Sequence, residues 1–409
     1  MHTKGTNLFA QMVALFDRHA FGKLVHKYGN DKHSKGFSSW EHFVSMLFCQ
    51  LGKAQSLREI CGGLASCTGK VVHLRMKEAP KRSTLSYANE HRDYRLFENL
   101  FYQLLEKCQK QFVGKSKFRF KNKLYSLDAT VIDLCLSMFD WAHFRQTKGA
   151  IKLHLILDHD GYLPCYAYIS EGKSHEVRVA KEEILPQFIF PAGSIVVVDL
   201  GYTDYTLFAH WCATKVFFVT RMKDNADYEA LETFEVTKSP TGRSRNILKD
   251  ERIRFCGFNS FKKCPYELRR IEVWDAEHER VIVLLTNNFK LASTTVAAIY
   301  KDRWQIEIFF KALKQNLKIK TFVGTSANAL KIQIWTALIA MLLLKYLNKL
   351  STFGWSLSNL IAMLRFNLFT YRDLTDWLNN PFETPPLLPD DGQLVLPGLG
   401  LGQQQGAGL

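Results

Sequence analysis

The sequence has no pair of cysteines in the CxxC spacing, although nine cysteines occur among its 409 residues. Most of the nine stand among apolar residues. The missing pairs argue against a structural zinc site, and the scattered single cysteines argue against a disulfide framework. We therefore expect buried free thiols, as in a protein of the reducing cytoplasm.

The sequence also lacks an apolar run long enough to span a bilayer, which takes about 20 residues. Its longest run, Ile334 to Leu344, is short and contains Thr336. We interpret this run as part of a buried core helix. The N-terminal residues have neither a long apolar core nor a small-residue cleavage site, so we expect no signal peptide.

Acidic residues are scarce relative to basic ones. The 39 Asp and Glu residues stand against 54 Lys and Arg, which gives a net charge of +15 and a pI near 9.3. Such a surplus indicates a polyanionic partner, either nucleic acid or an anionic membrane, and the short apolar runs weaken the membrane alternative. With 47% hydrophobic residues, the chain can form two or three domains and at least one sizeable core.

Residues 1–112 show the apolar spacing of helices, and one of these helices opens with a capping box at Ser38 and Glu41. A basic stretch, Lys70 to Arg82, lies between the predicted helices. A helical, basic region suits contact with a DNA backbone, and we predict a DNA-end-binding domain here. The alternative is an ordinary helical subdomain with a solvated basic edge.

From about residue 118 the apolar period changes to two, which is typical of strands. Three successive strands are predicted, then a helix, a fully apolar strand at 194–202, and a β-rich insertion at about 216–290. We predict a catalytic core over residues 118–350 and a helical segment over 351–382. The Pro-rich and then Gly/Gln-rich tail, 383–409, is expected to be disordered.

Two carboxylates occupy unusual positions in the predicted strands. Asp128 lies inside the first strand, where an apolar residue would be expected, and Asp199 ends the buried apolar strand. Ligand sites in open α/β sheets lie beyond the carboxyl ends of strands. A buried carboxylate is costly unless a cation compensates it. The alternatives are a hydrogen-bonded structural Asp128 and a turn-forming Asp199.

A third carboxylate, Glu307, lies in a predicted helix over residues 300–320. A projection at about 100° per residue places it within a ladder of cations that includes Arg303, Lys311 and Lys314, opposite an apolar face. The alternative is a solvated helix whose charged pairs, four residues apart, each contribute a few tenths of a kcal/mol. Together the three acids could form an all-oxygen cluster, which suits Mg²⁺ or Mn²⁺. Two such ions can activate water and stabilise a departing oxygen.

These residues carry a resemblance to a known family. The order three strands, helix, apolar strand, insertion and helix resembles the RNase H-like core of DDE transposases. Residues 300–314 resemble the Tyr-Arg-Glu-Lys signature of one bacterial insertion-sequence branch, with Y-x2-R-x3-E-x6-K spacing. "DAT" at 128–130 is similar to the DxT motif of that branch. "DLGY" at 199–202 is similar to its D-R-G-Y motif, except that Leu200 replaces the usual Arg.

The resemblance implies an α/β fold with an RNase H-like mixed-sheet core, a β-rich insertion and an N-terminal helical domain. It implies a DNA transposase that acts in the bacterial cytoplasm, at the nucleoid when bound to DNA. The enzyme would bind terminal inverted repeats and target DNA as a homodimer in a synaptic complex, then cut and join strands with two Mg²⁺ ions or with Mn²⁺.

The resemblance also implies roles for single residues. Asp128, Asp199 and Glu307 would be catalytic metal ligands. DNA contacts would come from the following residues: Tyr300, Arg303, Lys311, Lys314, Arg221 and Lys223. Trp274 is either a DNA-stacking residue of the insertion or a core residue. Two other functions stay open: a silent DNA-end-binding protein derived from a transposase, and an RNase H-like nuclease without strand transfer.

Overall fold

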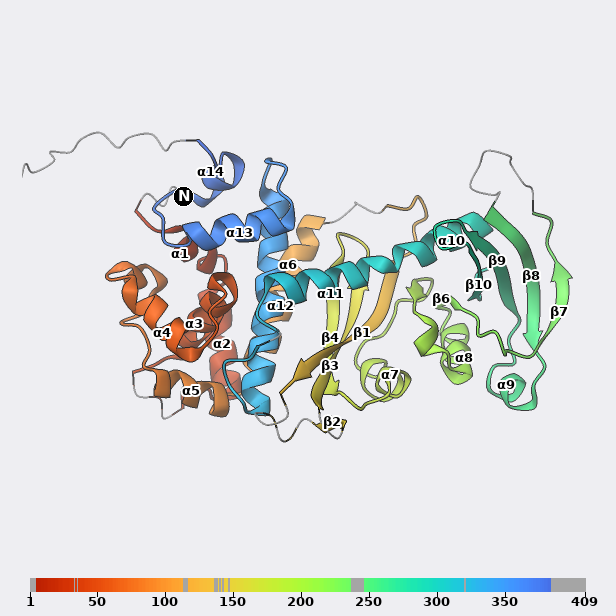
Figure 1. Ribbon diagram of the computed structural model, residues 1–409, viewed down its shortest axis with the longest axis horizontal. Helices are drawn as coiled ribbons and strands as arrows, with labels where there is room; N and C mark the ends of the chain where they lie inside the picture. Colours follow the sequence, from red (N-terminus) through yellow and green to blue (C-terminus); the bar gives the residue numbers. More distant parts are fainter. Residues whose placement is uncertain are drawn as a thin grey trace, which may run out of the picture.

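The computed structural model describes residues 5–32, 34, 36–112, 117–135, 139, 141, 143–145, 148–236, 246–319 and 321–383. These residues form a helical part and a large mixed β-sheet, with long helices that run between the two (Figure 1). The tail that we expected to be disordered, 383–409, lies outside the described residues except for Glu383.

The N-terminal region folds into helices. They are α1 (Leu8–Val13), α2 (Arg18–Tyr28), α3 (Ser39–Gly52), α4 (Leu57–Ser66), the 3₁₀ turn η1 (Lys70–Leu74), α5 (Arg82–His91) and α6 (Arg95–Phe112). The capping box predicted from the sequence is present at the start of α3. Ser38 Oγ accepts from the Glu41 N–H, and the Glu41 carboxylate accepts from the Ser38 N–H at 2.7 Å. Both first-turn donors are thereby satisfied.

The core sheet begins with antiparallel strands. They are β1 (Leu124–Leu134), the short β2 (His143–Arg145), β3 (Lys148–Asp158) and β4 (Leu163–Glu171). Strand β3 lies between β1 and β4, and β2 pairs with β3 at its edge. Apolar and polar residues alternate along these strands. The alternation favours such a sheet, because it gives each strand one apolar face that can be buried.

The sheet then continues with two parallel strands. Strand β5 (Ile195–Val197) pairs with β1, and β6 (Phe217–Arg221) pairs with β5. The connections are α7 (Glu176–Val179), a π-helical turn η2 (Ala180–Ile184), the 3₁₀ turn η3 (Leu200–Tyr202) and α8 (Tyr205–Ala213). The strand order β4-β3-β1-β5-β6, antiparallel and then parallel, is that of the RNase H-like fold, as expected.

The insertion extends this sheet and does not form a separate one. Its elements are β7 (Tyr228–Thr233), β8 (Ile247–Phe255), α9 (Phe258–Lys263), β9 (Leu268–Asp275) and β10 (Arg280–Thr286). Strand β10 pairs with β6, so the order runs β6-β10-β9-β8-β7. We expected the insertion to start at about 216, but β6 belongs to the core because it pairs with β5.

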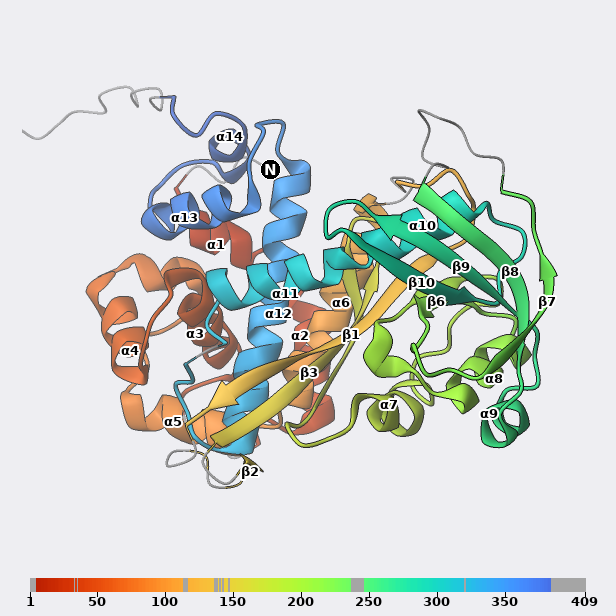
Figure 2. The same ribbon diagram turned by 45° about the vertical axis from the view of Figure 1, so that its right-hand side comes forward.

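Helices α10 (Ser293–Asp302) and α11 (Trp304–Asn316) run end to end from the insertion, across β1, to α12 (Ala327–Leu350) (Figures 1 and 2). The sequence predicted one helix over 300–320. The structure interrupts it at Arg303 and ends α11 at Asn316. Lys318, beyond the end of α11, is buried and donates to the side-chain carbonyl of Gln55.

Helix α12 is apolar around its whole circumference. By length and composition it could cross a membrane, but 83% of its apolar window is buried inside the protein. It packs against α3, α5 and α6 of the N-terminal region. The run from Ile334 to Leu344 is therefore a core helix, as we interpreted it. It also joins the predicted catalytic core to the predicted N-terminal domain.

The chain end returns to the chain start. Helices α13 (Leu357–Asn367) and α14 (Leu374–Asn379) lie beside α1. The Leu8 N–H donates to the Thr370 carbonyl at 3.0 Å, and the Phe9 N–H donates to the Leu368 carbonyl at 2.8 Å. Residues 351–382 therefore complete the N-terminal helical layer.

A buried ion pair in the insertion gives a stability prediction. The Arg269 guanidinium contacts both carboxylate oxygens of Asp250, at 2.8 and 2.6 Å, and both side chains are buried. We expect Asp250→Ala to lower the free energy of unfolding by about 3–5 kcal/mol, because it leaves a buried cation uncompensated. The measurement is chemical denaturation of the full chain.

The matched control for Asp250→Ala is Glu106→Ala. Glu106 pairs with Lys110 at 3.1 Å on the exposed face of α6. Its removal should cost less than about 1 kcal/mol. Equal losses from the two variants would contradict the importance of the buried pair.

Candidate active site

The strand register sets two of the predicted acids side by side. Ser126 on β1 pairs with Val197 on β5, and Val197 pairs with Val219 on β6. Two residues further along these parallel strands stand Asp128, Asp199 and Arg221. Because neighbouring strands lie about 4.8 Å apart, the three side chains form one row at the carboxyl edge of the sheet.

Helix α11 adds the third acid. A cavity of about 530 Å³ opens between the carboxyl edge of the sheet and α11. It is lined by Asp128, Ala129, Thr130, Asp199, Glu307, Phe310, Lys311, Lys314 and Gln315. All three carboxylates predicted from the sequence therefore meet at one cavity, together with two of the predicted cations.

Arg303 lies between the carboxylates. Its Nη2 is 2.7 Å from Glu307 Oε1, and its Nη1 is 3.5 Å from Asp128 Oδ2. The sequence predicted a DNA phosphate contact for this residue, whereas the structure gives it carboxylate partners within the protein. The guanidinium can compensate the acids because its fork carries donors in two directions. Its Nε is buried and has no hydrogen-bond partner among the described residues.

Burial perturbs the acids of the cavity. Burial, together with the negative charges of Asp199 and Glu307, raises the pKa of the Asp128 carboxyl to about 7, although Arg303 and the Ala129 N–H act against the shift. Burial also raises the pKa of Asp199, which Arg303 lowers in turn. The positive charge near these acids is too small to compensate all of their negative charges, so simultaneous ionisation is unfavourable.

Sequence reasoning missed a fourth carboxylate. Glu176, at the start of α7, acts electrostatically on Asp199 and raises its pKa. Lys152 on β3 holds Glu176 at 3.1 Å. A signal existed in the sequence, because Glu176 opens the helix that precedes the apolar strand. The link to Asp199 depends on how η3 returns toward α7, and no local pattern showed that.

The remaining predicted residues lie around the cavity. Lys314 lines it and donates from Nζ to the Val131 carbonyl of β1 at 2.8 Å. The Tyr300 ring, on α10, lies under the Arg303 guanidinium at 5.7 Å. Arg221 acts electrostatically on Tyr300, so it lies near this end of α10. Lys223 follows β6, is exposed, and does not line the cavity.

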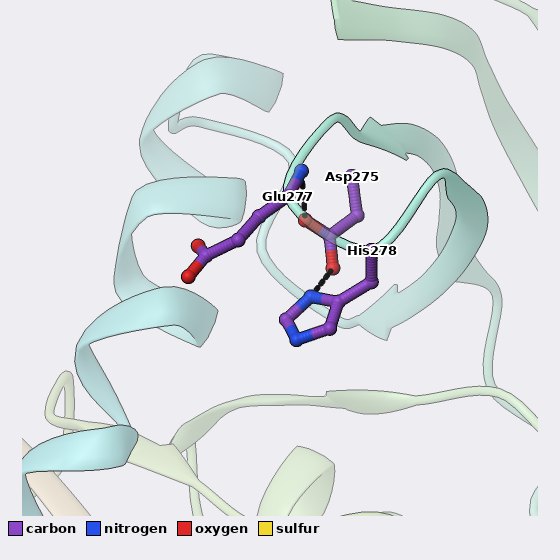
Figure 3. A group of neighbouring side chains, drawn as sticks. All are labelled: Asp275, Glu277 and His278. Carbon is purple, nitrogen blue, oxygen red and sulfur yellow. Dashed lines mark hydrogen bonds and ion pairs between the residues drawn. The ribbon is translucent and has the colours of Figure 1, made fainter.

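Another group of potential metal ligands occurs in the turn between β9 and β10 (Figure 3). Among the described residues, Asp275, Glu277 and His278 are the group of three whose ligand atoms lie within 4.8 Å of one another. His278 Nδ1 contacts Asp275 at 2.8 Å, and the Glu277 carboxylate pairs with Lys301 at 3.2 Å. These contacts satisfy the group within the protein.

Trp274 precedes that turn, on β9, and is 38% exposed. The sequence left open whether this residue belongs to the core or stacks on DNA. Trp274 is therefore not a fully buried core residue. Its partner across the strands, Val281, is also exposed.

The residues of the cavity fit a hard divalent cation. The donors are carboxylate oxygens from β1, from Asp199 between β5 and η3, and from α11, with no sulfur or imidazole among the lining residues. Such oxygens are the ligands that Mg²⁺ and Mn²⁺ prefer. Burial raises the pKa of Asp128, so a cation bound beside it would favour its ionised form.

The strand order, one acid within β1, a second acid just after the neighbouring strand β5 and a third acid on a crossing helix define the RNase H-like class of DNA-processing enzymes. The sequence profile described as a transposase DDE domain matches residues 119–343, which is more than half of the chain. The chain therefore belongs to the DDE transposase family, whose members use a divalent metal ion to cleave and join DNA. Residues 4–77 match a domain of unknown function, DUF4372.

Proteins of similar sequence are also named as transposases. The chain is 28% identical to a Sinorhizobium fredii protein named as transposase y4zB, over 75% of this chain and 82% of that protein. It is 26% identical to proteins named as transposases of insertion sequence elements IS5377 of Geobacillus stearothermophilus and IS4SA of Synechocystis. These matches cover 65% of this chain in both cases, and 67% and 71% of the two relatives.

One solved structure is also similar, the piggyBac transposase synaptic complex with hairpin DNA. Its TM-score is 0.41 at 11% identity, over 93% of this chain and 81% of that chain.

The pKa of Asp128 gives a pH-dependent prediction for metal-free protein in EDTA. The folded-state pKa of about 7 lies above the unfolded value near 3.9, so the folded state binds this proton more tightly. The stabilising effect of the proton is therefore complete at low pH and is lost as the pH rises through about 7. Asp128→Asn cannot lose a proton. The melting temperature of Asp128→Asn, relative to that of the wild type, should therefore increase as the pH rises from about 5 to about 8.

The control for this measurement is Asp133→Asn, because Asp133 is exposed on the same strand. A melting-temperature difference between Asp128→Asn and wild type that stays constant with pH would rule out the raised pKa.

Proposed function

We propose that Asp128, Asp199 and Glu307 bind the catalytic metal of a transposase that cuts and rejoins insertion-sequence ends. The observation that carries the proposal is the convergence of these three carboxylates at one cavity with Lys311 and Lys314. The three acids lie far apart in the sequence. Their convergence suits the metal-dependent cleavage of DNA that the family carries out.

The metal is proposed to be Mg²⁺, with Mn²⁺ as a substitute, and two ions are proposed to bind. When bound, they supply an activated water and stabilise the departing oxygen. The carboxylates hold the cations at the sheet edge. The Asp199 carboxylate is already oriented for this by the Gly201 N–H, which donates to it at 2.9 Å.

The cations at the rim are proposed to hold DNA phosphates. Lys311 is exposed at the cavity mouth, and Lys314 is held by the Val131 carbonyl so that its charge stays at the cavity. Arg221 and Tyr300 extend the surface along β6 and α10. Lys223 continues it outside the cavity, as a contact to the DNA backbone. Arg303 compensates the acids in the DNA-free protein and is proposed to contact phosphate when DNA and metal are bound.

The wider assembly is proposed from the charge and the family. The substrates are terminal inverted repeats and target DNA, held by a homodimer in a synaptic complex in the bacterial cytoplasm. Residues 1–112, with their basic stretch, are proposed to bind the DNA ends. They share a helical layer with residues 351–382, and α12 packs this layer against the catalytic core over 118–350.

Two other functions make different predictions. A silent DNA-end-binding protein would bind the ends without cutting them. An RNase H-like nuclease would hydrolyse DNA without joining strands. The presence of all three carboxylates at one cavity favours the transposase over the silent protein, and a strand-transfer assay separates the transposase from the nuclease.

Single replacement of the carboxylates tests the metal assignment. We expect Asp128→Ala, Asp199→Ala and Glu307→Ala each to abolish Mg²⁺-dependent nicking of a plasmid that carries the element's ends. Removal of a ligand disables water activation and leaving-group stabilisation together. DNA affinity should survive, because it comes mainly from Lys and Arg contacts. Substantial nicking by Asp199→Ala in Mg²⁺ would refute the assignment.

Replacement of the cations tests the DNA contacts. We expect Arg303→Lys to remain defective in nicking, since a lysine cannot reproduce the two-directional fork, and Lys314→Arg to retain more activity. Arg303→Ala and Lys314→Ala should weaken end binding and reduce its salt dependence by about one phosphate contact each. The measurement is nicking rate and end-DNA affinity across a salt series.

The control for the cation variants is Arg178→Ala. Arg178 is exposed on α7 and pairs with Glu182 at 3.0 Å. It should leave nicking and salt dependence unchanged. If Arg303→Ala and Lys314→Ala fold normally and behave like this control, Arg303 and Lys314 do not contact DNA phosphates.

A further inference from the structure

Three buried side chains form a hydrogen-bonded chain between the sheet and the helix pair α10–α11. Ser126 Oγ is 2.7 Å from His159 Nε2, and His159 Nδ1 is 2.7 Å from Asp302 Oδ2. All three residues are at most 5% exposed. Ser126 lies on β1, His159 directly follows β3, and Asp302 is the last residue of α10.

Asp302 is fully satisfied within the protein. The Lys117 ammonium contacts its Oδ1 at 2.6 Å, and the Tyr162 hydroxyl donates to its Oδ2 at 3.2 Å. Although burial acts to raise the pKa of Asp302, the His159 and Lys117 contacts hold it below the usual value. A buried carboxylate with this many partners is fixed in position, since losing any partner leaves charge uncompensated.

The order Ser-His-Asp is also that of a hydrolytic triad, in which the Asp orients the His and the His activates the Ser. Such a triad needs a serine that a substrate can reach. Ser126 is completely buried and does not line the cavity of the acids. Ser126 therefore cannot act as a nucleophile, and the hydrogen-bonded chain serves to hold its members in position.

Each end of the chain is next to a residue of the candidate active site. Ser126 precedes Asp128 by two residues on β1, so both side chains point to the same face of the sheet. Asp302 directly precedes Arg303, where α10 gives way to α11. We propose that Ser126, His159 and Asp302 are positioning residues that hold the α10–α11 junction against β1, so that Arg303 and Glu307 meet Asp128.

The proposal rests on the proposed function for its catalytic consequence, but the positional effect is independent of it. His159 uses both ring nitrogens, so its ring cannot rotate without breaking both bonds. At the junction the Arg303 backbone keeps helical dihedrals, and its N–H donates to the Ile299 carbonyl at 3.2 Å, so the local backbone bonds continue but do not tie the helix pair to β1. A side-chain clamp at Asp302 fixes the direction in which α11 leaves.

The test uses Ser126→Ala, which removes one hydroxyl, and Asp302→Asn, which keeps the shape of the side chain and removes its charge. The matched control is Ser170→Ala. Ser170 Oγ is 2.9 Å from Nε2 of the buried His154, which pairs with Ala129 and therefore lies on the face opposite Asp128. This pair has the same chemistry and no contact with α10 or α11 among the described interactions.

The first measurement is amide hydrogen exchange on the full-length protein, without DNA or metal. We expect residues 299–307 to exchange about tenfold faster in Ser126→Ala and Asp302→Asn than in wild type, since exchange reports local opening. Ser170→Ala should match wild type there. Equal exchange in all four proteins, each with a normal melting curve, would overturn the proposal.

The second measurement is nicking of end DNA at saturating Mg²⁺. We expect the rate to fall by about 10–100-fold in Ser126→Ala, as for loss of a residue that orients metal ligands, with end-DNA affinity nearly unchanged. The double variant should be scarcely slower than the more affected single variant, because both act through His159. Independent, multiplicative losses would contradict a single chain. If the wild type does not nick at all, the proposed function fails, and the exchange result still decides the positional effect.

Discussion

Burial of carboxylates that lie close together is the constraint on which the site depends. Asp128, Asp199 and Glu307 meet at the end of a sheet where burial disfavours their charge, and burial raises the pKa of Asp128 to about 7. The protein offsets this with one guanidinium placed between Asp128 and Glu307. The offset is incomplete, so the cavity favours cations. A catalytic metal and a positively charged rim follow from the same imbalance.

The architecture holds those acids in position through long-range pairing. Parallel register between β1, β5 and β6 aligns Asp128, Asp199 and Arg221 along the carboxyl edge of the sheet. The helix pair α10–α11 crosses the same edge and reaches from the insertion to α12 (Figure 2). Because β10 continues the core sheet through β6, the insertion and the strands that position the acids belong to one continuous sheet.

Sequence reasoning was most successful where the physical signal is local. The period-two pattern predicted β1, β3 and β4, and charge placed inside apolar strands marked Asp128 and Asp199. Glu307 stood out because it was surrounded by cations. The carboxylate partners of Arg303, Asp128 and Glu307, could not be predicted, since the contact with Asp128 joins elements that are distant in the sequence. The assignment of β6 to the core, the burial of Lys318 and the Ser126–His159–Asp302 chain also depend on contacts between residues distant in sequence. No local pattern encodes them.

The pairing of α1 with residues 368–370 bears on how the protein is made. The Leu8 and Phe9 N–H groups donate to carbonyls at 370 and 368, so translation must pass residue 370 before both bonds can form. Domains generally fold as units during synthesis, beginning at the N-terminus. Here Phe9 can meet Phe48 of α3 early, but its contact with Phe369 must wait for residues 368–370. A chain truncated before residue 368 would contain Asp128, Asp199 and Glu307 and would lack these partners of α1.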